Sequence, residues 1–374
     1  MALPRGMTKT IKNFFLATGL LVSTIIGAGV FALPYVFQNS SFKLGFFYLA
    51  LAALVYTIIH RMYAEIIFST KAEHRFVGFS EKYFGKPGFW LAVLIAVVEI
   101  FLVLTIYLIL SVSFANLLFP GIADWLKVLL FWLFGSSIIF IGLRRLASIE
   151  FIIALLILAI IIVVHYLGFS RLNEFSFLSS GSLGLLAPIA PILFALSGRV
   201  GLHAVADLFR GEKEPLKKAS LAISLGTIIP AVVYGLFVVG MIGLTPIASE
   251  DSITGLIGQV PSWLAITIGI LGIISLLSSY IAAGFDIKHV LKTDLKFPNW
   301  LMILTVVGVP LGLYFANLSS FLGLISLVGG VLLSLEGIMI ALMWQKLKGR
   351  FSPLAWALVS VFSIVLIHQI VSRI

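Results

Sequence analysis

Apolar stretches long enough to cross a bilayer follow one another along almost the whole chain. A membrane-spanning helix needs roughly 20 mostly apolar residues, and the hydrophobic pattern predicts eleven of them. The predicted spans cover approximately residues 11–38, 44–70, 88–119, 125–142, 147–168, 183–210, 217–244, 262–288, 299–318, 321–346 and 353–373. The connections between them are too short for a separate soluble domain, so we expect a single all-α membrane domain over residues 1–374.

Two of the predicted spans are interrupted near their centres. The first contains Gly27 and Gly29, the sixth contains Gly198, and four predicted spans lie between these interruptions. Interrupted helices at corresponding places of two halves indicate a transporter built from inverted repeats. We therefore expect two inverted five-helix repeats with discontinuous first and sixth helices, plus one extra helix. The first repeat is expected over residues 11–168, the second over residues 183–346 and the extra helix over residues 353–373.

The interruptions predict a binding site because a broken helix leaves backbone groups without partners. In lipid, each unpaired N–H or C=O group costs several kcal/mol unless a partner is found. N–H groups that begin an outer half-helix attract a carboxylate, and carbonyls that end an inner half-helix attract a cation. An amino acid offers both charges. The alternative is that Gly27 and Gly29 only allow close helix packing, but the second interruption favours binding.

Composition supports a membrane protein and excludes several classes of site. The chain is 61% hydrophobic and 11% charged, with a mean hydropathy of +1.16, which a water-soluble fold cannot bury. It has no cysteine, so disulfides, thiol nucleophiles and thiolate metal sites are excluded. Signatures of zinc proteases, serine hydrolases and nucleotide-binding loops are also missing. His203 and Asp207, four residues apart, suggest at most a metal pair or a structural hydrogen bond, and we expect no enzyme and no cofactor.

The charge of +10 is explained by topology rather than by a nucleic-acid partner. Most of the 25 Lys and Arg residues fall on one side of the predicted spans, together with the N-terminus. The positive-inside rule makes that side cytoplasmic, so we expect a multi-pass protein of the cytoplasmic membrane with a cytoplasmic N-terminus. On the same side, the polar residues 71–87 have aromatic positions at helical spacing, which predicts a helix along the membrane face. The lipid bilayer is the expected partner, and no obligatory protein partner is evident.

Residues of the first span carry a family resemblance. Ile26 to Pro34 follow the pattern Ile-Gly-Ala-Gly-(Val/Ile)-Phe-x-Leu-Pro, and the chain resembles the amino acid/polyamine/organocation transporter superfamily. It is most similar to the aromatic and hydroxy amino acid permease branch, on residues 194–198, 278–280 and 284–286 and on its length of eleven spans. The resemblance implies a secondary active transporter that carries amino acids with a coupling ion by alternating access. A channel or a transporter-like amino acid sensor is the alternative.

The resemblance also implies which residues bind the substrate. Backbone groups of the two interruptions would hold its amino and carboxylate groups, and Phe194 would close over it, although Phe194 could instead be a core aromatic. Tyr107, on the third span, could face the site with its hydroxyl. The predicted substrate residues are Thr24, Ile25, Gly27, Ala28, Gly29, Tyr107, Phe194, Ala195, Ser197 and Gly198. An apolar lining that includes Ile25, Phe194 and Val200 favours a neutral, aromatic or other apolar amino acid.

Four ionisable residues inside the spans are candidates for coupling or gating: Glu65, Glu99, Arg199 and Glu336. Glu65 follows Gly27 at the spacing at which related folds bring a glutamate against the broken helices, but Arg61 one turn earlier could simply neutralise it. Arg199 near the bilayer centre costs at least about 2.5 to 3.5 kcal/mol and needs an anion or water. Its partner could be any of the three glutamates or a carboxylate of the substrate. Only the last of these alternatives would favour an acidic substrate. Glu99 or Glu336 could carry a coupling proton, or each could be paired structurally.

The coupling ion is left open between H+ and Na+. In sodium-coupled relatives a cation lies between the first and eighth helices, and the matching positions here are Ser23, Ile26, Ser275, Ser278 and Ser279. The aromatic amino acid permeases keep a similar Ser-Ser pair and are regarded as proton symporters. The fifth span has no lysine that could replace the cation. Protons are slightly favoured.

Overall fold

The structure is a computed structural model that describes residues 5–70, 74–141, 146–172, 183–245, 247–317 and 320–372, and every regular element in these ranges is helical. The first half contains α1 (Arg5–Ile25), η1 (Ala28–Ala32), α2 (Leu33–Asn39), α3 (Phe42–Ser69), α4 (Phe76–Leu118), α5 (Asp124–Ile141) and α6 (Leu146–Phe169). The second half contains α7 (Ile189–Leu196), α8 (Arg199–Phe209), α9 (Pro215–Leu244), η2 (Thr254–Leu256), α10 (Ser262–His289), η3 (Val290–Asp294), α11 (Asn299–Ala316), α12 (Phe321–Leu327), η4 (Val328–Leu332), α13 (Leu333–Lys348) and α14 (Pro353–Val371).

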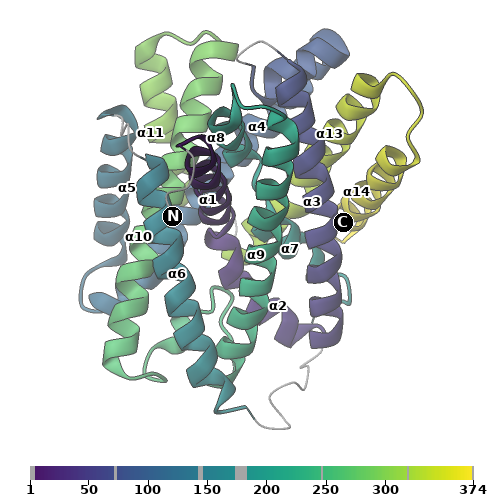
Figure 1. The fold of residues 1–374 in the computed structure, drawn as a ribbon. Coiled ribbons are helices and arrows are strands. Elements are labelled where there is room, and N and C mark those ends of the chain that lie inside the picture. Colours follow the sequence, from purple (N-terminus) through teal and green to yellow (C-terminus); the bar gives the residue numbers. More distant parts are fainter. Residues whose placement is uncertain are drawn as a thin grey trace.

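Eight helices of the described residues are long and apolar enough to cross a membrane, or nine if the bent pair at the N-terminal end is one span. Helices α5 and α6 occupy the fourth and fifth predicted spans but are not among these. The all-helical prediction is confirmed, whereas the described residues do not establish the predicted count of eleven. Figure 1 shows α1 inside the bundle beside α6, α8 and α9, with α5 and α14 at opposite edges.

The first predicted interruption is a real break. Helix α1 ends at Ile25, and the two parts of the span meet at an angle of 45°. Gly27 has an extended backbone (φ −119°, ψ −148°) and donates its N–H to the Ile25 carbonyl over 2.8 Å, two residues back instead of four. Pro34 lies in the first turn of α2, where its missing N–H breaks no helical hydrogen bond. The second part of the span therefore starts again as η1 and α2.

The second interruption separates α7 from α8 and lies directly against the first. Ser197 is extended (φ −64°, ψ 129°) and Gly198 is also non-helical (φ −143°, ψ 11°). A Cβ atom on Gly29 would lie 2.8 Å from the Ala195 Cβ and 2.9 Å from the Ala195 backbone nitrogen. No side chain fits at such distances, so the glycine is what allows the two broken segments to touch.

A helix precedes the third span, as predicted. Residues 76–118 are joined as α4, but Gly85 is non-helical (φ 69°, ψ −159°) and divides α4 into two helices. The two parts are joined at a bend where Gly85 has a positive φ of 69°, a conformation that glycine adopts without strain. Phe76 and Phe79, at the start of this helix, are fully buried. The segment before Gly85 is thus packed into the protein and not only laid along its face.

Candidate functional site at the helix breaks

A cavity of about 80 Å³ lies where the two breaks meet, between α4 and α10. All predicted substrate residues except Ala195 line it: Thr24, Ile25, Gly27, Ala28, Gly29, Tyr107, Phe194, Ser197 and Gly198. Ala195 lies behind the wall, in contact with Gly29. The structure therefore brings together residues that are up to about half the chain apart, and both breaks contribute backbone to the same space.

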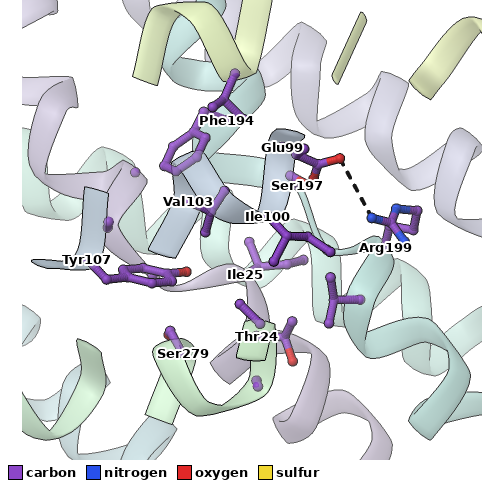
Figure 2. A pocket seen from close by; sticks show the side chains of 18 of the residues that line it. Thr24, Ile25, Glu99, Ile100, Val103, Tyr107, Phe194, Ser197, Arg199 and Ser279 are labelled. Atoms are coloured by element: carbon purple, nitrogen blue, oxygen red, sulfur yellow. Dashed lines mark ion pairs between the residues drawn. The ribbon is translucent and has the colours of Figure 1, made fainter. Parts of the chain in front are cut away.

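The cavity has an apolar wall and two different polar ends. Figure 2 shows Phe194 and Val103 on one side, Tyr107 with Ser279 at one end, and Glu99 with Arg199 at the other. The Tyr107 hydroxyl is hydrogen-bonded to Ser279, and it would lie 3.1 Å from a Cβ on Gly27. A ligand in this cavity would meet neutral hydroxyl groups at one end and a charged cluster at the other.

Tyr234 of α9 holds the two breaks together and was not predicted. Its hydroxyl lies 2.7 Å from the carbonyl oxygen of Ile25 and 2.9 Å from that of Ala195, and the side chain is fully buried. These are the carbonyls that end α1 and precede the second break. A phenol has one proton to donate, so it serves one of these carbonyls at a time. A tyrosine in the middle of an apolar span was the available signal, because a buried hydroxyl needs a partner.

Arg199, the first residue of α8, is surrounded by three carboxyl groups from three other helices. Its Nη2 lies 3.7 Å from Glu99 Oε2 of α4, and its Nη1 lies 3.6 Å from Asp286 Oδ2 of α10. Its Nε donates to Glu336 Oε2 of α13. All four side chains are at most 7% exposed, and the guanidinium also lies over the Phe76 ring at 5.1 Å. Two of the predicted partners are confirmed, and Asp286 is an additional one.

The predicted position of Glu65 against the helix breaks is wrong. Glu65 accepts a hydrogen bond of 2.7 Å from Trp344 Nε1 and pairs with Lys348. It lines a separate pocket away from the helix breaks, and Arg61 lines the same pocket. The spacing from Gly27 predicted the level of the residue along α3 but not its face. His60, about 140° around the helix from Glu65, is the residue that faces the break: its Cε1 would lie 3.1 Å from a Cβ on Gly198.

The five residues of the predicted cation site are divided between two cavities. Ser23, Ser278 and Ser279 line the central cavity. Ile26 and Ser275 line a neighbouring cavity of about 40 Å³, whose other walls are almost entirely apolar. In the part of the chain that the structure describes, no group of three or more His, Asp or Glu residues is arranged to hold a metal ion.

His203 and Asp207 do not form a metal pair. His203 Nε2 lies 3.1 Å from the Tyr63 hydroxyl and its ring stacks on Phe79, whereas Asp207 is exposed and pairs with Arg210 at 3.2 Å. Each residue has its own partner, so the predicted hydrogen bond between His203 and Asp207 is not formed either.

Comparison with known proteins gives a family and a fold. The model of the tryptophan/tyrosine permease family matches residues 10–368. Tyrosine-specific transport system 1 of Haemophilus influenzae is 24% identical over 308 residues, which cover 78% of this chain and 74% of that protein.

Three solved structures share the fold at low sequence identity. Mhp1, a nucleobase-cation-symport-1 family transporter in a closed conformation with bromovinylhydantoin bound, has a TM-score of 0.68 at 15% identity, covering 91% of this chain and 80% of Mhp1. MhsT in complex with L-phenylalanine has a TM-score of 0.67 at 16% identity, with 97% and 98% covered. A manganese transporter of Eremococcus coleocola has a TM-score of 0.68 at 13% identity, with 100% and 89% covered.

Proposed function

The chain belongs to the tryptophan/tyrosine permease family and is a multi-pass membrane transporter, and from this premise we propose that it carries a neutral aromatic amino acid by ion-coupled symport. The proposal rests above all on one observation, the convergence of both helix breaks on one cavity. The substrate carboxylate would bind N–H groups that begin the segments after Gly27 and Gly198. Its ammonium group would bind carbonyls that end the segments before them.

The lining of the cavity supports an aromatic side chain. Ile100, Val103 and Phe194 supply apolar surface, and the hydroxyls of Tyr107 and Ser279 lie at one end. An aromatic ring packs against such apolar walls, and a phenol or indole also carries one polar group that can hydrogen-bond a hydroxyl. Tyrosine transport by the Haemophilus influenzae relative and L-phenylalanine in MhsT agree with this choice.

The surroundings of Arg199 favour a neutral substrate over an acidic one. Three carboxyl groups already compensate its single positive charge. No positive charge is left over for a side-chain carboxylate, and an added anion would meet like charges. The arginine is therefore proposed to act within the protein and not as the ligand of an acidic solute.

Alternating access would open the cavity first to one side of the cell membrane and then to the other, with the N-terminus in the cytoplasm. Two inverted five-helix repeats would provide the symmetry for this exchange. Gly29 and Tyr234 fit such a mechanism because both connect the two broken segments. Because these contacts leave no free space, a movement of the backbone at one break would also move the backbone at the other.

Uptake by the purified chain in proteoliposomes tests the proposal. Labelled tyrosine is supplied with each of the twenty amino acids in turn as competitor, first with sodium replaced and then with the proton gradient collapsed. We expect saturable accumulation above the external concentration, with competition strongest from tyrosine, tryptophan and phenylalanine. Equilibration without accumulation would indicate a channel instead, binding without flux a sensor, and dominant competition by glutamate or aspartate would contradict the substrate class.

A further inference from the structure

The cluster around Arg199 has an imbalance of charge. One guanidinium is enclosed by the three carboxyls of Glu99, Asp286 and Glu336, each at most 7% exposed. In the part of the chain that the structure describes, Arg199 is the one cationic side chain paired with these acids. If all three carboxyls were ionised, the cluster would have a net charge of −2 in a site closed to water. Burial of uncompensated charge is strongly unfavourable, so the cluster needs a further cation.

The geometry indicates where that cation binds. The carboxyl groups of Glu99 and Glu336 face the same guanidinium: Arg199 Nη2 lies 3.7 Å from Glu99 Oε2, and Arg199 Nε donates to Glu336 Oε2. Two ionised carboxylates that face one guanidinium repel each other, and a proton on one of them removes that repulsion. The Oε2 atom of Glu99 and the Oδ2 atom of Asp286 have no hydrogen-bond partner among the described residues. Their distances of 3.7 and 3.6 Å to the guanidinium are too long for hydrogen bonds.

Among the described residues no further cation forms an ion pair with these acids, although Arg75, just before α4, interacts electrostatically with Tyr63 and His203. Tyr56 and Tyr63 of α3 interact electrostatically with its acids, and Tyr63 is hydrogen-bonded to His203, one turn after Arg199 on α8. His60 of α3 is hydrogen-bonded through Nδ1 to Thr227, at 2.9 Å. The described residues also contain no three-ligand group for a metal ion. A proton needs no such set of ligands, because a single carboxyl oxygen can bind it.

We propose that the Glu99–Glu336 pair is the binding site of the coupling proton, with Arg199 and Asp286 as the fixed charges beside it. This inference rests on the proposed symport and names its ion. Glu99 and Arg199 line the substrate cavity, so the proton and the substrate occupy adjoining sites. Asp286 balances the arginine, and the pair keeps one proton as long as the cavity is closed. Release of that proton to water leaves the cluster at −2.

This charge couples proton release to opening of the cavity. In the closed protein the deprotonated cluster has no solvent and three mutually repelling carboxylates. When the cavity opens, water stabilises the same charges and accepts the proton. The proton therefore leaves together with the substrate in the open state. Return of the empty, deprotonated protein through the closed state is opposed until a new proton binds.

The test uses the full chain in sodium-free proteoliposomes that contain a pH-sensitive dye. Two activities are measured: exchange of labelled for unlabelled tyrosine at equal pH on both sides, and accumulation driven by an alkaline interior. For one proton per substrate, one pH unit drives accumulation of at most about tenfold. The variants are Glu99→Gln and Glu336→Gln, and the matched control is Glu214→Gln, the same change at a side chain that is 70% exposed.

Exchange and accumulation are compared within Glu99→Gln and Glu336→Gln, because an amide can donate a hydrogen bond as a protonated carboxyl does but cannot release a proton. Their accumulation should fall from about tenfold to equality across the membrane, without acidification of the dye, whereas Glu214→Gln should match the wild type. If both glutamine variants lose exchange as well, Glu99→Asp decides. The aspartate keeps a titratable carboxyl but increases its distance from the Glu336 carboxyl. The pH at which accumulation is half-maximal should therefore shift.

Four results separate the inference from the function on which it rests. Accumulation by Glu99→Gln and Glu336→Gln at the wild-type ratio would overturn the proton site, and so would an unshifted midpoint in Glu99→Asp. Wild-type accumulation that requires sodium and leaves the dye unchanged would overturn the proton site but preserve ion-coupled symport. Failure of the wild type to exchange or take up any aromatic amino acid would instead contradict the proposed function itself.

Discussion

Replacement of Tyr234 by phenylalanine removes a single hydroxyl group and tests whether the two helix breaks act as one unit. That hydroxyl lies 2.7 Å from the Ile25 carbonyl and 2.9 Å from the Ala195 carbonyl, in a fully buried position. The Ile25 carbonyl still accepts the N–H of Gly27 in the variant. The Ala195 carbonyl has no such replacement among the backbone contacts outside the helices. A buried acceptor without a donor costs about 1 to 3 kcal/mol.

The expected loss has two parts that can be measured separately. The variant should unfold at a lower temperature, and it should bind tyrosine more weakly because the breaks that shape the cavity are no longer tied. If all of the cost appeared in binding, the Kd for tyrosine would rise by about 5- to 150-fold. Thermal unfolding of the purified protein and binding of labelled tyrosine in detergent measure the two parts.

Tyr280→Phe is the matched control for this prediction. Tyr280 is also fully buried, but its hydroxyl has one long contact of 3.3 Å, to Ser136, away from the cavity. Its loss should cost no more than about 1 kcal/mol and leave the Kd unchanged. If Tyr234→Phe behaved like Tyr280→Phe in both measurements, the hydroxyl would not hold the breaks, and the coupling between them would need another explanation.

Three further predictions concern the contact between the two breaks, the carboxyl cluster and the ion pair between Lys218 and Glu212. Gly29→Ala should abolish tyrosine binding, because the added Cβ meets the backbone of Ala195 and overpacking of this kind costs about 1 to 3 kcal/mol or more; binding at wild-type strength would contradict it. Arg199→Ala leaves three buried carboxyls without their cation, which costs about 3 to 5 kcal/mol, and should abolish uptake; wild-type uptake would remove its functional role. The Lys218 ammonium beside Glu212 holds the pKa of that carboxyl below its ordinary value. This contact therefore stabilises the protein above the ordinary pKa and is lost as pH falls through the lowered one; the melting temperatures of wild type and Glu212→Gln, compared from pH 7 to pH 3, should converge at acid pH.

The helix breaks could be predicted from the sequence because local backbone chemistry determines them. Glycine at two positions of the first span and one position of the sixth weakens the helix, and Pro34 fits without loss of a hydrogen bond at the start of a new segment. Within a membrane, such breaks persist only where the unpaired backbone groups find other hydrogen-bond partners, which predicts a ligand or a protein contact at the break. These arguments need no knowledge of how the helices are arranged.

The faces of the helices could not be predicted in the same way. In a chain that is apolar on all sides, the hydrophobic pattern does not indicate which face of a helix is buried. Each residue turns the side chain by about 100°, and the spacing from Gly27 suggested Glu65, whereas the residue that faces the break is His60, five positions earlier. Asp286 was noticed only within a motif, because nothing local to α10 indicates that Arg199 of α8 lies opposite. Packing between distant helices decides both cases.

One position joins the two sites that the structure brings together. Gly198 forms the break, and Arg199, the next residue, begins α8 and holds the carboxyl cluster. A Cβ on Gly198 would lie 2.7 Å from a side-chain carbon of Ile25, so the break has no room to move independently of the first one. Any rearrangement of the backbone around a bound amino acid must therefore displace the guanidinium relative to Glu99 and Glu336. Because charge in a closed site depends steeply on distance, that displacement changes the free energy of holding the proton, and substrate binding and proton binding become linked through a single peptide unit.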